Sequence, residues 1–158
     1  MEPYTEMQEI SAYLEHVSFQ ARKEYLAHMI AWVHERIQNM AFQETDRLKI
    51  ELAMEEALVN IIMHAYPYHS TRAILEIVIL LRANQSVEFT ILDKGRPFNP
   101  LLQAGKLHIH IDLEKREEGG LGILFMRHCM DEVHYQRQHP FNILTLVKKM
   151  KPEKAIAD

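Results

Sequence analysis

The sequence is short of several residue types, and each shortage argues against a class of protein. Its single cysteine, Cys129, cannot form an internal disulfide or a cysteine-built zinc site, so a reducing compartment is expected. No apolar run is longer than Ile77 to Leu81, which is far below a membrane span. The first residues show no cationic segment followed by an apolar one, as a signal peptide would. We therefore expect a cytoplasmic protein without a membrane segment.

Long basic runs are also missing. The chain has 18 basic and 22 acidic side chains, a net charge of -4, and no basic run longer than Lys148-Lys149. Nucleic-acid binding is therefore not expected, because phosphate contacts need a basic surface. We expect Lys148, Lys149 and Lys151 to be solvated. With 158 residues, 47% of them hydrophobic and 25% charged, the chain is expected to form one globular domain over residues 1–158.

Glycine is scarce and confined to one window. There are only five glycines, and they lie at Gly95, Gly105, Gly119, Gly120 and Gly122. Glycine allows a positive φ and lets a ligand approach the main chain closely, as nucleotide sites require. Ordinary turns are the alternative explanation of this clustering.

Hydrophobic periodicity predicts two helices in the first half of the chain. Apolar residues at three-to-four spacing predict a long amphipathic helix over 14–40, with a short edge strand before it at 6–12. A second helix is predicted from Asp46 to Ala65, with Thr45 or Asp46 as N-cap and Pro67 closing it. Apolar side chains cover most of its circumference, which predicts a buried rod.

The second half predicts strands, loops and one more helix. These are strands over 73–82 and 87–92 that form a hairpin, a loop over 93–100, a lid over 101–118, a helix over 123–130, and strands over 132–138 and 142–149. Two helices, a hairpin, a loop, a helix and a second hairpin predict an α+β fold. We expect a two-layer sandwich in which helices cover one face of a mixed β-sheet.

Three polar residues interrupt the apolar surface of the second helix. Glu56, Asn60 and His64 are spaced four residues apart and so form one line on the helix. Buried without partners they would cost several kcal/mol. They form either a structural network or a site in which Asn60 offers an oxygen to Mg²⁺ and Glu56 orients or deprotonates a nucleophile.

Two further motifs are suited to a nucleotide. Asp93 ends a predicted strand and Gly95 follows it, so a carboxylate could accept a hydrogen bond from an exocyclic amine while a flat ring approaches the backbone. The run Gly119-Gly120-Leu121-Gly122 opens a predicted helix, where bare N–H groups and the helix dipole favour phosphate. It fits neither the Walker nor the Rossmann pattern.

In this order the motifs resemble those of the GHKL ATPases, the family of nucleotide domains found in histidine kinases, gyrases, Hsp90 and MutL. Residues 56–67 resemble the N box, 93–100 the G1 box, 101–118 the lid and 119–126 the G2 box. The His-Ala-Tyr-Pro end of the N box and the Pro-Phe-Asn-Pro extension of G1 are similar to those of one branch. That branch is the RsbW-type bacterial anti-sigma factors, which are also serine-protein kinases.

The resemblance implies a partner switch. Such a protein binds ATP and Mg²⁺, sequesters a sigma factor, and phosphorylates a serine or threonine on a STAS-domain anti-anti-sigma factor. It also implies a homodimer. An alternative is an ATP-dependent docking module that sequesters a non-sigma partner with weak or no kinase activity.

The resemblance also implies roles for single residues. Glu56 would be the general base, and Asn60 would coordinate Mg²⁺. Nucleotide contacts would come from Asn60, His64, Asp93, Gly95, Pro97, Phe98, Gly119, Gly120, Leu121 and Gly122. Two departures from the family pattern weaken the expectation of fast transfer. Glu117-Glu118 precede the G2 glycines. The threonine of a third box has no clear match, and either Asn142 or Thr145 would fill its place.

Overall fold

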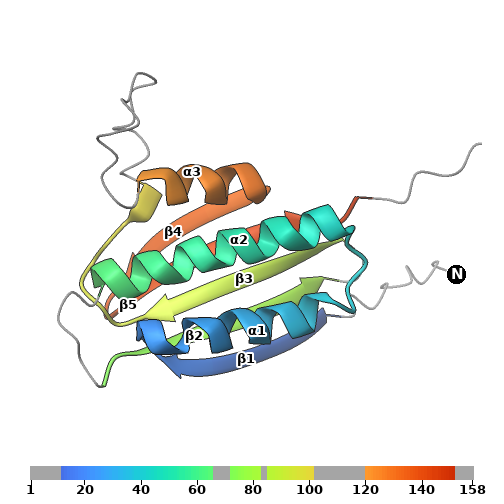
Figure 1. Cartoon of the computed structure of the whole chain (residues 1–158). Coiled ribbons are helices and arrows are strands. Elements are labelled where there is room, and N and C mark those ends of the chain that lie inside the picture. The colour runs from blue at the N-terminus through green and yellow to red at the C-terminus, as the bar shows by residue number, and fades with distance from the viewer. Residues whose placement is uncertain (1–11, 66–71, 83–84, 102–119, 152–158) are drawn as a thin grey trace, which may run out of the picture.

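A single sheet and one layer of helices make up the described part of the chain, residues 12–65, 72–82, 85–101 and 120–151 of the computed structural model (Figure 1). The strands are β1 (Ala12–Gln20), β2 (Ile74–Arg82), β3 (Ser86–Asp93), β4 (Glu132–Gln138) and β5 (Phe141–Lys149). The helices are α1 (Leu26–Ile37), α2 (Glu44–Asn60) and α3 (Gly120–Cys129), with short turns η1 (Lys23–Tyr25) and η2 (Ile61–Ala65). None of the described helices is long and apolar enough to cross a membrane.

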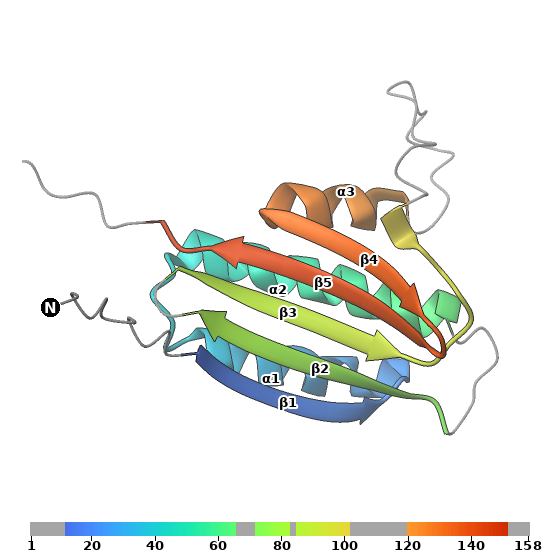
Figure 2. The ribbon, with the colours of Figure 1, turned by 180° about the vertical axis from the view of Figure 1, so that it is seen from behind.

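The strand order is β1-β2-β3-β5-β4, and all four pairings are antiparallel. The expected α+β two-layer sandwich is confirmed, but the expectation of a mixed sheet is wrong. Hairpins join β2 to β3 and β4 to β5, and the α1–α2 pair returns the chain beside β1 in the opposite direction. No parallel pair therefore arises among the described strands. Seen from behind, the sheet carries no helix (Figure 2).

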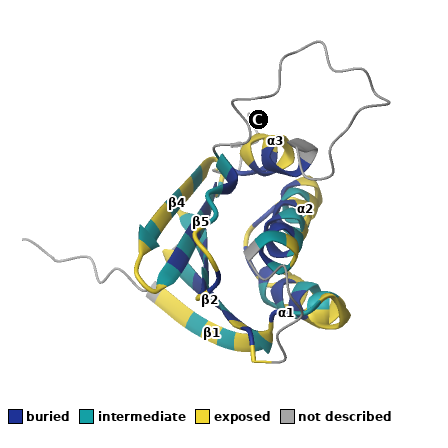
Figure 3. Cartoon of the chain, turned by 90° about the vertical axis from the view of Figure 1, so that its left-hand side faces the viewer, coloured by how far each residue is buried: buried dark blue, intermediate teal, exposed yellow. Residues whose placement is uncertain are grey.

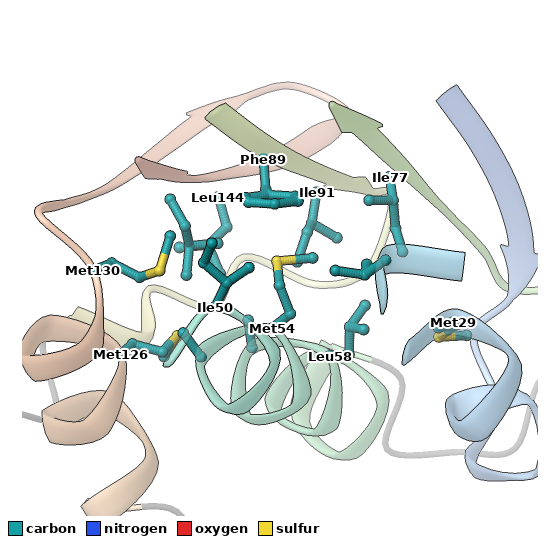
Figure 4. Packing of buried hydrophobic residues seen from close by; sticks show 14 of the residues in the cluster. Met29, Ile50, Met54, Leu58, Ile77, Phe89, Ile91, Met126, Met130 and Leu144 are labelled. Atoms are coloured by element: carbon teal, nitrogen blue, oxygen red, sulfur yellow. The ribbon is translucent and has the colours of Figure 1, made fainter. Parts of the chain in front are cut away.

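The core lies between the two layers (Figure 3). The predicted hairpin over β2 and β3 is confirmed, and alternate residues such as Ile77, Phe89 and Ile91 are fully buried. Ile50 and Met54 of α2 point up at them from the helical layer (Figure 4). Each such side chain contributes about 1.5–3 kcal/mol of burial free energy. This interdigitation fixes α2, which carries two of the predicted site residues, on the middle of the sheet.

The prediction of one helix over 14–40 is wrong in its first third, where the chain forms the edge strand β1. Val17 and Phe19 are half-buried against the core, whereas Leu14 is 64% exposed. Glu15 breaks the apolar alternation of the strand, and its Oε1 lies 2.6 Å from Arg36 Nη2 on α1. The spacing of apolar residues from residue 14 onward is compatible with a helix or a strand. Pairing with the otherwise open edge of β2 favours the strand. The edge strand predicted over 6–12 lies outside the described residues apart from Ala12.

Helix α2 also differs from the prediction at its ends and on its surface. It begins at Glu44 with Gln43 as N-cap and has no side-chain cap, so the capping role expected of Thr45 or Asp46 is wrong. After Asn60 the chain continues as the π-helical turn η2. Leu48 is 54% exposed, so the helix is not buried all round. The Asp46 side chain instead turns into the protein.

Lys148 is buried, contrary to the expectation that it belongs to a solvated cluster. It is only 5% exposed, and its Nζ donates a 2.7 Å hydrogen bond to the carbonyl of Cys129 at the end of α3. The same Nζ lies 3.7 Å from Oδ1 of Asp46 in the first turn of α2. Cys129 is buried, as expected. One ammonium group of β5 therefore ties α2 to α3.

Lys148→Met is expected to lower the free energy of unfolding by about 3 kcal/mol, because it leaves the buried Asp46 carboxylate and the Cys129 carbonyl without their cation. Chemical denaturation measures the loss. The matched control is Lys149→Met, whose exposed ammonium pairs with Glu132 at 3.5 Å and is expected to contribute less than about 1 kcal/mol. The double variant Lys148→Met/Asp46→Leu should recover much of the lost stability. Equal effects of the two lysine variants would contradict this account of the tie.

Candidate functional site

Glu56 and Asn60 of α2 face the glycine-rich start of α3. Gly122 is buried there, and a Cβ built on it would collide with the Glu56 carboxylate and lie 3.5 Å from Asn60 Nδ2. The missing side chain at Gly122 leaves the space that the Glu56 carboxylate occupies. The predicted third helix is therefore present, but it begins at Gly120 with the glycine motif in its first turn. Two members of the predicted polar line thus meet the predicted phosphate cradle.

Asn60 has an unsatisfied donor. The side chain is 5% exposed, and its Nδ2 is buried without a hydrogen-bond partner among the described residues. Such a group costs about 1–3 kcal/mol. A structural network would have satisfied it, so this unpaired N–H group favours a ligand that accepts a hydrogen bond, such as a phosphate oxygen, whereas a cation would bind the Asn60 oxygen. No group of three histidine, cysteine or acidic side chains able to hold a metal occurs in the described part of the chain. An Mg²⁺ ion at Asn60 would therefore take most of its ligands from phosphates and water, as Mg²⁺ commonly does.

The carboxyl group of Glu56 has a raised pKa, which suits it to accept a proton. Its partial burial raises the pKa of the carboxyl group, and the negative charge of neighbouring Glu55 raises it further. A carboxylate with a raised pKa is a stronger base when ionised. The raised pKa and the place beside Gly122 both fit a base that serves a reaction at the glycine-rich end of α3.

Gly122→Ala is expected to reduce by about 100-fold the phosphoryl transfer that the resemblance implies, while changing the melting temperature little. The new Cβ would meet the far end of the flexible Glu56 side chain, which can swing aside without disturbing the core. The cost therefore falls on the position of the carboxylate. Comparing the transfer rate with the thermal melting curve tests this, and Ala53→Gly in the same α2–α3 layer provides a contrasting variant that lowers stability. A large loss of stability in Gly122→Ala would contradict it.

Asp93 lies at the end of β3, as predicted, and is 3% exposed. Its Oδ1 accepts hydrogen bonds from the N–H of Gly95 at 2.8 Å and from Nδ2 of Asn142 at 2.9 Å. Burial raises the pKa of Asp93, and these two hydrogen bonds and the charge of Arg137 partly oppose the rise. Of the two third-box candidates, it is Asn142 that contacts Asp93. Thr145 follows the buried Leu144, so it points to the other face of the sheet.

The end of the N box and the G1 loop are in contact. The ring of His64 stacks on that of Phe98, with centroids 4.8 Å apart, and Arg96 Nε donates a 2.7 Å hydrogen bond to the His64 carbonyl. His64 lies in the π-helical turn η2 that continues α2 after Asn60. His64 therefore anchors the loop, and Pro97 on the same loop is exposed.

A narrow pocket joins these parts. It lies between Ala57 and Asn60 of α2, Asp93, Phe98 of the G1 loop, and Asn142 of β5. Its volume is about 10 Å³, which is room for about one water molecule. A nucleotide base can therefore enter only if the walls separate, and the Phe98 loop is the wall that does not belong to a helix or strand.

Some predicted site residues cannot be placed. Gly119 and residues 102–118 of the predicted lid lie outside the described residues, and only the helical backbone of Gly120 and Leu121 is described. Conversely, Tyr135 and Arg137 of β4 both hydrogen-bond to Asn142 and were not identified from the sequence. Neither belongs to a motif, and alternation along β4 marks them only as facing inward.

Known proteins are similar to this chain in sequence. The family model described as the histidine kinase-like ATPase domain matches residues 19–148. The serine/threonine-protein kinase BtrW of Bordetella bronchiseptica is 34% identical over 108 residues, which are 68% of this chain and 73% of BtrW. The serine-protein kinase RsbW of Bacillus licheniformis is 31% identical over 108 residues, which are 61% of this chain and 62% of RsbW.

A solved structure shares the fold. The RsbU and RsbW domains of Rv1364c from Mycobacterium tuberculosis match with a TM-score of 0.64 at 14% identity, over 92% of this chain and 35% of that chain. This chain thus spans about a third of that solved chain and under two thirds of the Bacillus licheniformis kinase.

Proposed function

Because this chain belongs to the histidine kinase-like ATPase domain family, we propose that it is a serine/threonine-protein kinase that transfers a phosphoryl group from ATP to a partner protein. Both curated relatives are named protein kinases, which supports this class of reaction. The nucleotide domain would span residues 1–158, with the N box at 56–67, the G1 box at 93–100, the lid at 101–118 and the G2 box at 119–126.

The observation that carries the proposal is the meeting of Glu56, Asn60 and Gly122. It combines a carboxylate of raised pKa, an unpaired buried amide N–H group and a glycine at the helix start that leaves room for that carboxylate. Phosphoryl transfer depends mainly on positioning and charge neutralisation, so these groups are a sufficient set.

The residues fit ATP and Mg²⁺. Asn60 would hold the metal, the first turn of α3 would receive phosphate oxygens at its N–H groups, and Asp93 would bind the base. His64, Phe98 and the neighbouring Pro97 would form the wall beside the ring. ATP supplies the phosphoryl group, and Mg²⁺ neutralises charge on the phosphates.

Glu56 would accept the proton of the partner's hydroxyl group. The hydroxyl oxygen then forms its bond to phosphorus as the bond to the ADP oxygen breaks. Its raised pKa suits Glu56 to this role.

The partner would be a STAS-domain anti-anti-sigma factor, and the competing partner a sigma factor, in a cytoplasmic partner switch. A phosphate adds a charge of about -1.5 to -2 and would break a fitted interface, which releases the phosphorylated partner and frees this protein to hold the sigma factor. The proposal includes a homodimer, which light scattering of the purified protein tests directly.

Incubation of the protein with γ-labelled ATP, Mg²⁺ and each STAS protein of the same genome tests the proposed function. We expect label on one STAS protein, lost when its acceptor serine or threonine is replaced by alanine. ATP binding without transfer to any of them would instead support the docking module, and absence of ATP binding would refute the proposal.

A further inference from the structure

A polar network behind Asp93 reaches two side chains outside every sequence motif. Asn142 of β5 is its centre and is 3% exposed. Its Oδ1 accepts hydrogen bonds from the Tyr135 hydroxyl at 2.6 Å and from Arg137 Nη1 at 3.1 Å. Its Nδ2 donates to Asp93 Oδ1 at 2.9 Å and to the Arg96 carbonyl at 3.0 Å. The amide therefore stands between a cation and a carboxylate.

Arg137 and the acceptors on the opposite side together fix which way this amide points. A guanidinium group can only donate hydrogen bonds, so the Asn142 atom that faces it must be the oxygen. The amide nitrogen must then face Asp93. The Asp93 carboxylate and the Gly95 and Arg96 carbonyls, which can only accept, hold the nitrogen on their side. Arg137 fixes the position of the amide from its oxygen side.

The same network leaves Asp93 with one oxygen for a ligand. Both hydrogen bonds that it accepts within the described residues end on Oδ1. Arg137 Nη1 also donates to the Gly95 carbonyl at 3.0 Å and so holds the turn whose N–H group is one of those donors. The remaining carboxylate oxygen has no donor in the described part of the chain, and Asp93 lines the narrow pocket.

We propose that Arg137 is a positioning residue that, through Asn142, fixes Asp93 to select a purine carrying an amino group over one carrying a carbonyl group at the same place. The proposal rests on the proposed binding of ATP and deepens it. An amino group donates to the fixed carboxylate oxygen. A carbonyl group presents a second acceptor to it, and a buried site built for one hydrogen-bonding pattern rejects the opposite pattern strongly.

Calorimetric binding of ADP and of inosine diphosphate tests this. The two purines differ at C6, where ADP has an amino group and inosine diphosphate a carbonyl group, and at the adjacent N1, which carries a hydrogen only in inosine diphosphate. The parent is expected to prefer ADP by about 100-fold or more. In Arg137→Met the preference should fall by at least about tenfold. A purely structural role would weaken both nucleotides equally and leave their ratio unchanged. Arg137→Lys, which keeps a cationic donor but not the planar fork, should retain part of the preference.

Arg82→Met is the matched control, since Arg82 lies at the far end of β2 and pairs with Glu88 at 3.9 Å. It should leave the ratio unchanged. If Arg137→Met does not fold, Tyr135→Phe removes only the neutral donor to the same Asn142 oxygen and should lower the preference by a smaller factor. An unchanged ratio in the folded variants overturns the inference, whereas a parent that binds neither nucleotide overturns the proposed function itself.

Discussion

Asp93→Asn is expected to weaken ADP binding by about 100-fold or more. The carboxylate has an oxygen available to accept from an amino group, whereas the Asn amide would keep its oxygen on the Gly95 N–H and turn a donor toward the base. Calorimetry or fluorescence titration with ADP measures the loss. The matched control is Glu88→Gln, which makes the same acid-to-amide change on the same strand away from the pocket, and its affinity should equal the parent's.

The stability of Asp93→Asn separates a binding defect from misfolding. Burial raises the pKa of Asp93 in the folded protein, so above its pKa the ionised group opposes folding rather than favouring it. Replacing it by a neutral amide should therefore leave the melting temperature at pH 7 close to the parent's. In the parent, protonation of Asp93 should weaken ADP binding as the pH is lowered. Because the pKa of Asp93 is raised, this loss of affinity should begin at a higher pH than it would with an ordinary carboxyl group. Full affinity in Asp93→Asn would refute the assignment of Asp93 to the base.

Glu56→Gln is expected to retain nucleotide binding and to lower phosphoryl transfer by about 100- to 10,000-fold. Glutamine keeps the shape of the side chain beside Gly122 but cannot accept the proton of the hydroxyl group. Single-turnover transfer to the partner protein, measured beside ADP affinity, separates the two effects. Transfer at the parent rate would show that Glu56 is not the general base.

Glu55→Gln is the matched control for Glu56→Gln, because it changes the neighbouring acid and leaves the base in place. At neutral pH transfer should continue. The charge of Glu55 raises the pKa of Glu56, so its removal lowers that pKa and should move the acid limb of the rate profile to lower pH. A shift to higher pH, or none, would contradict this coupling.

The parts of the site that follow from local sequence could be predicted, and those made by packing could not. Asp93 and Gly95 are two residues apart at a strand end, and Glu56 and Asn60 are one helical turn apart, so spacing alone places each pair. By contrast, the sequence pattern around Lys148 predicts a surface residue. Its burial depends on its contacts with Asp46 and the end of α3, which come from other parts of the chain.

The fold shows the same division. The β2–β3 hairpin alternates clearly, and the structure confirms it. In β1, Glu15 stands at an inward position, and only its pairing with Arg36 makes that position tolerable. A rule based on periodicity cannot anticipate such a partner, because Arg36 comes from another element. The helix predicted from residue 14 failed for that reason.

The strand order also bears on how the protein is made. β5, the last of the described strands to be synthesised, is not at an edge but lies between β3 and β4. It also carries Asn142 and Lys148, which complete the pocket around Asp93 and the tie between α2 and α3. A nascent chain that has not yet released residues 141–149 from the ribosome therefore exposes the inner edge of β3 and lacks both features. The pocket around Asp93 that the proposed nucleotide would occupy is therefore complete only after translation has passed β5.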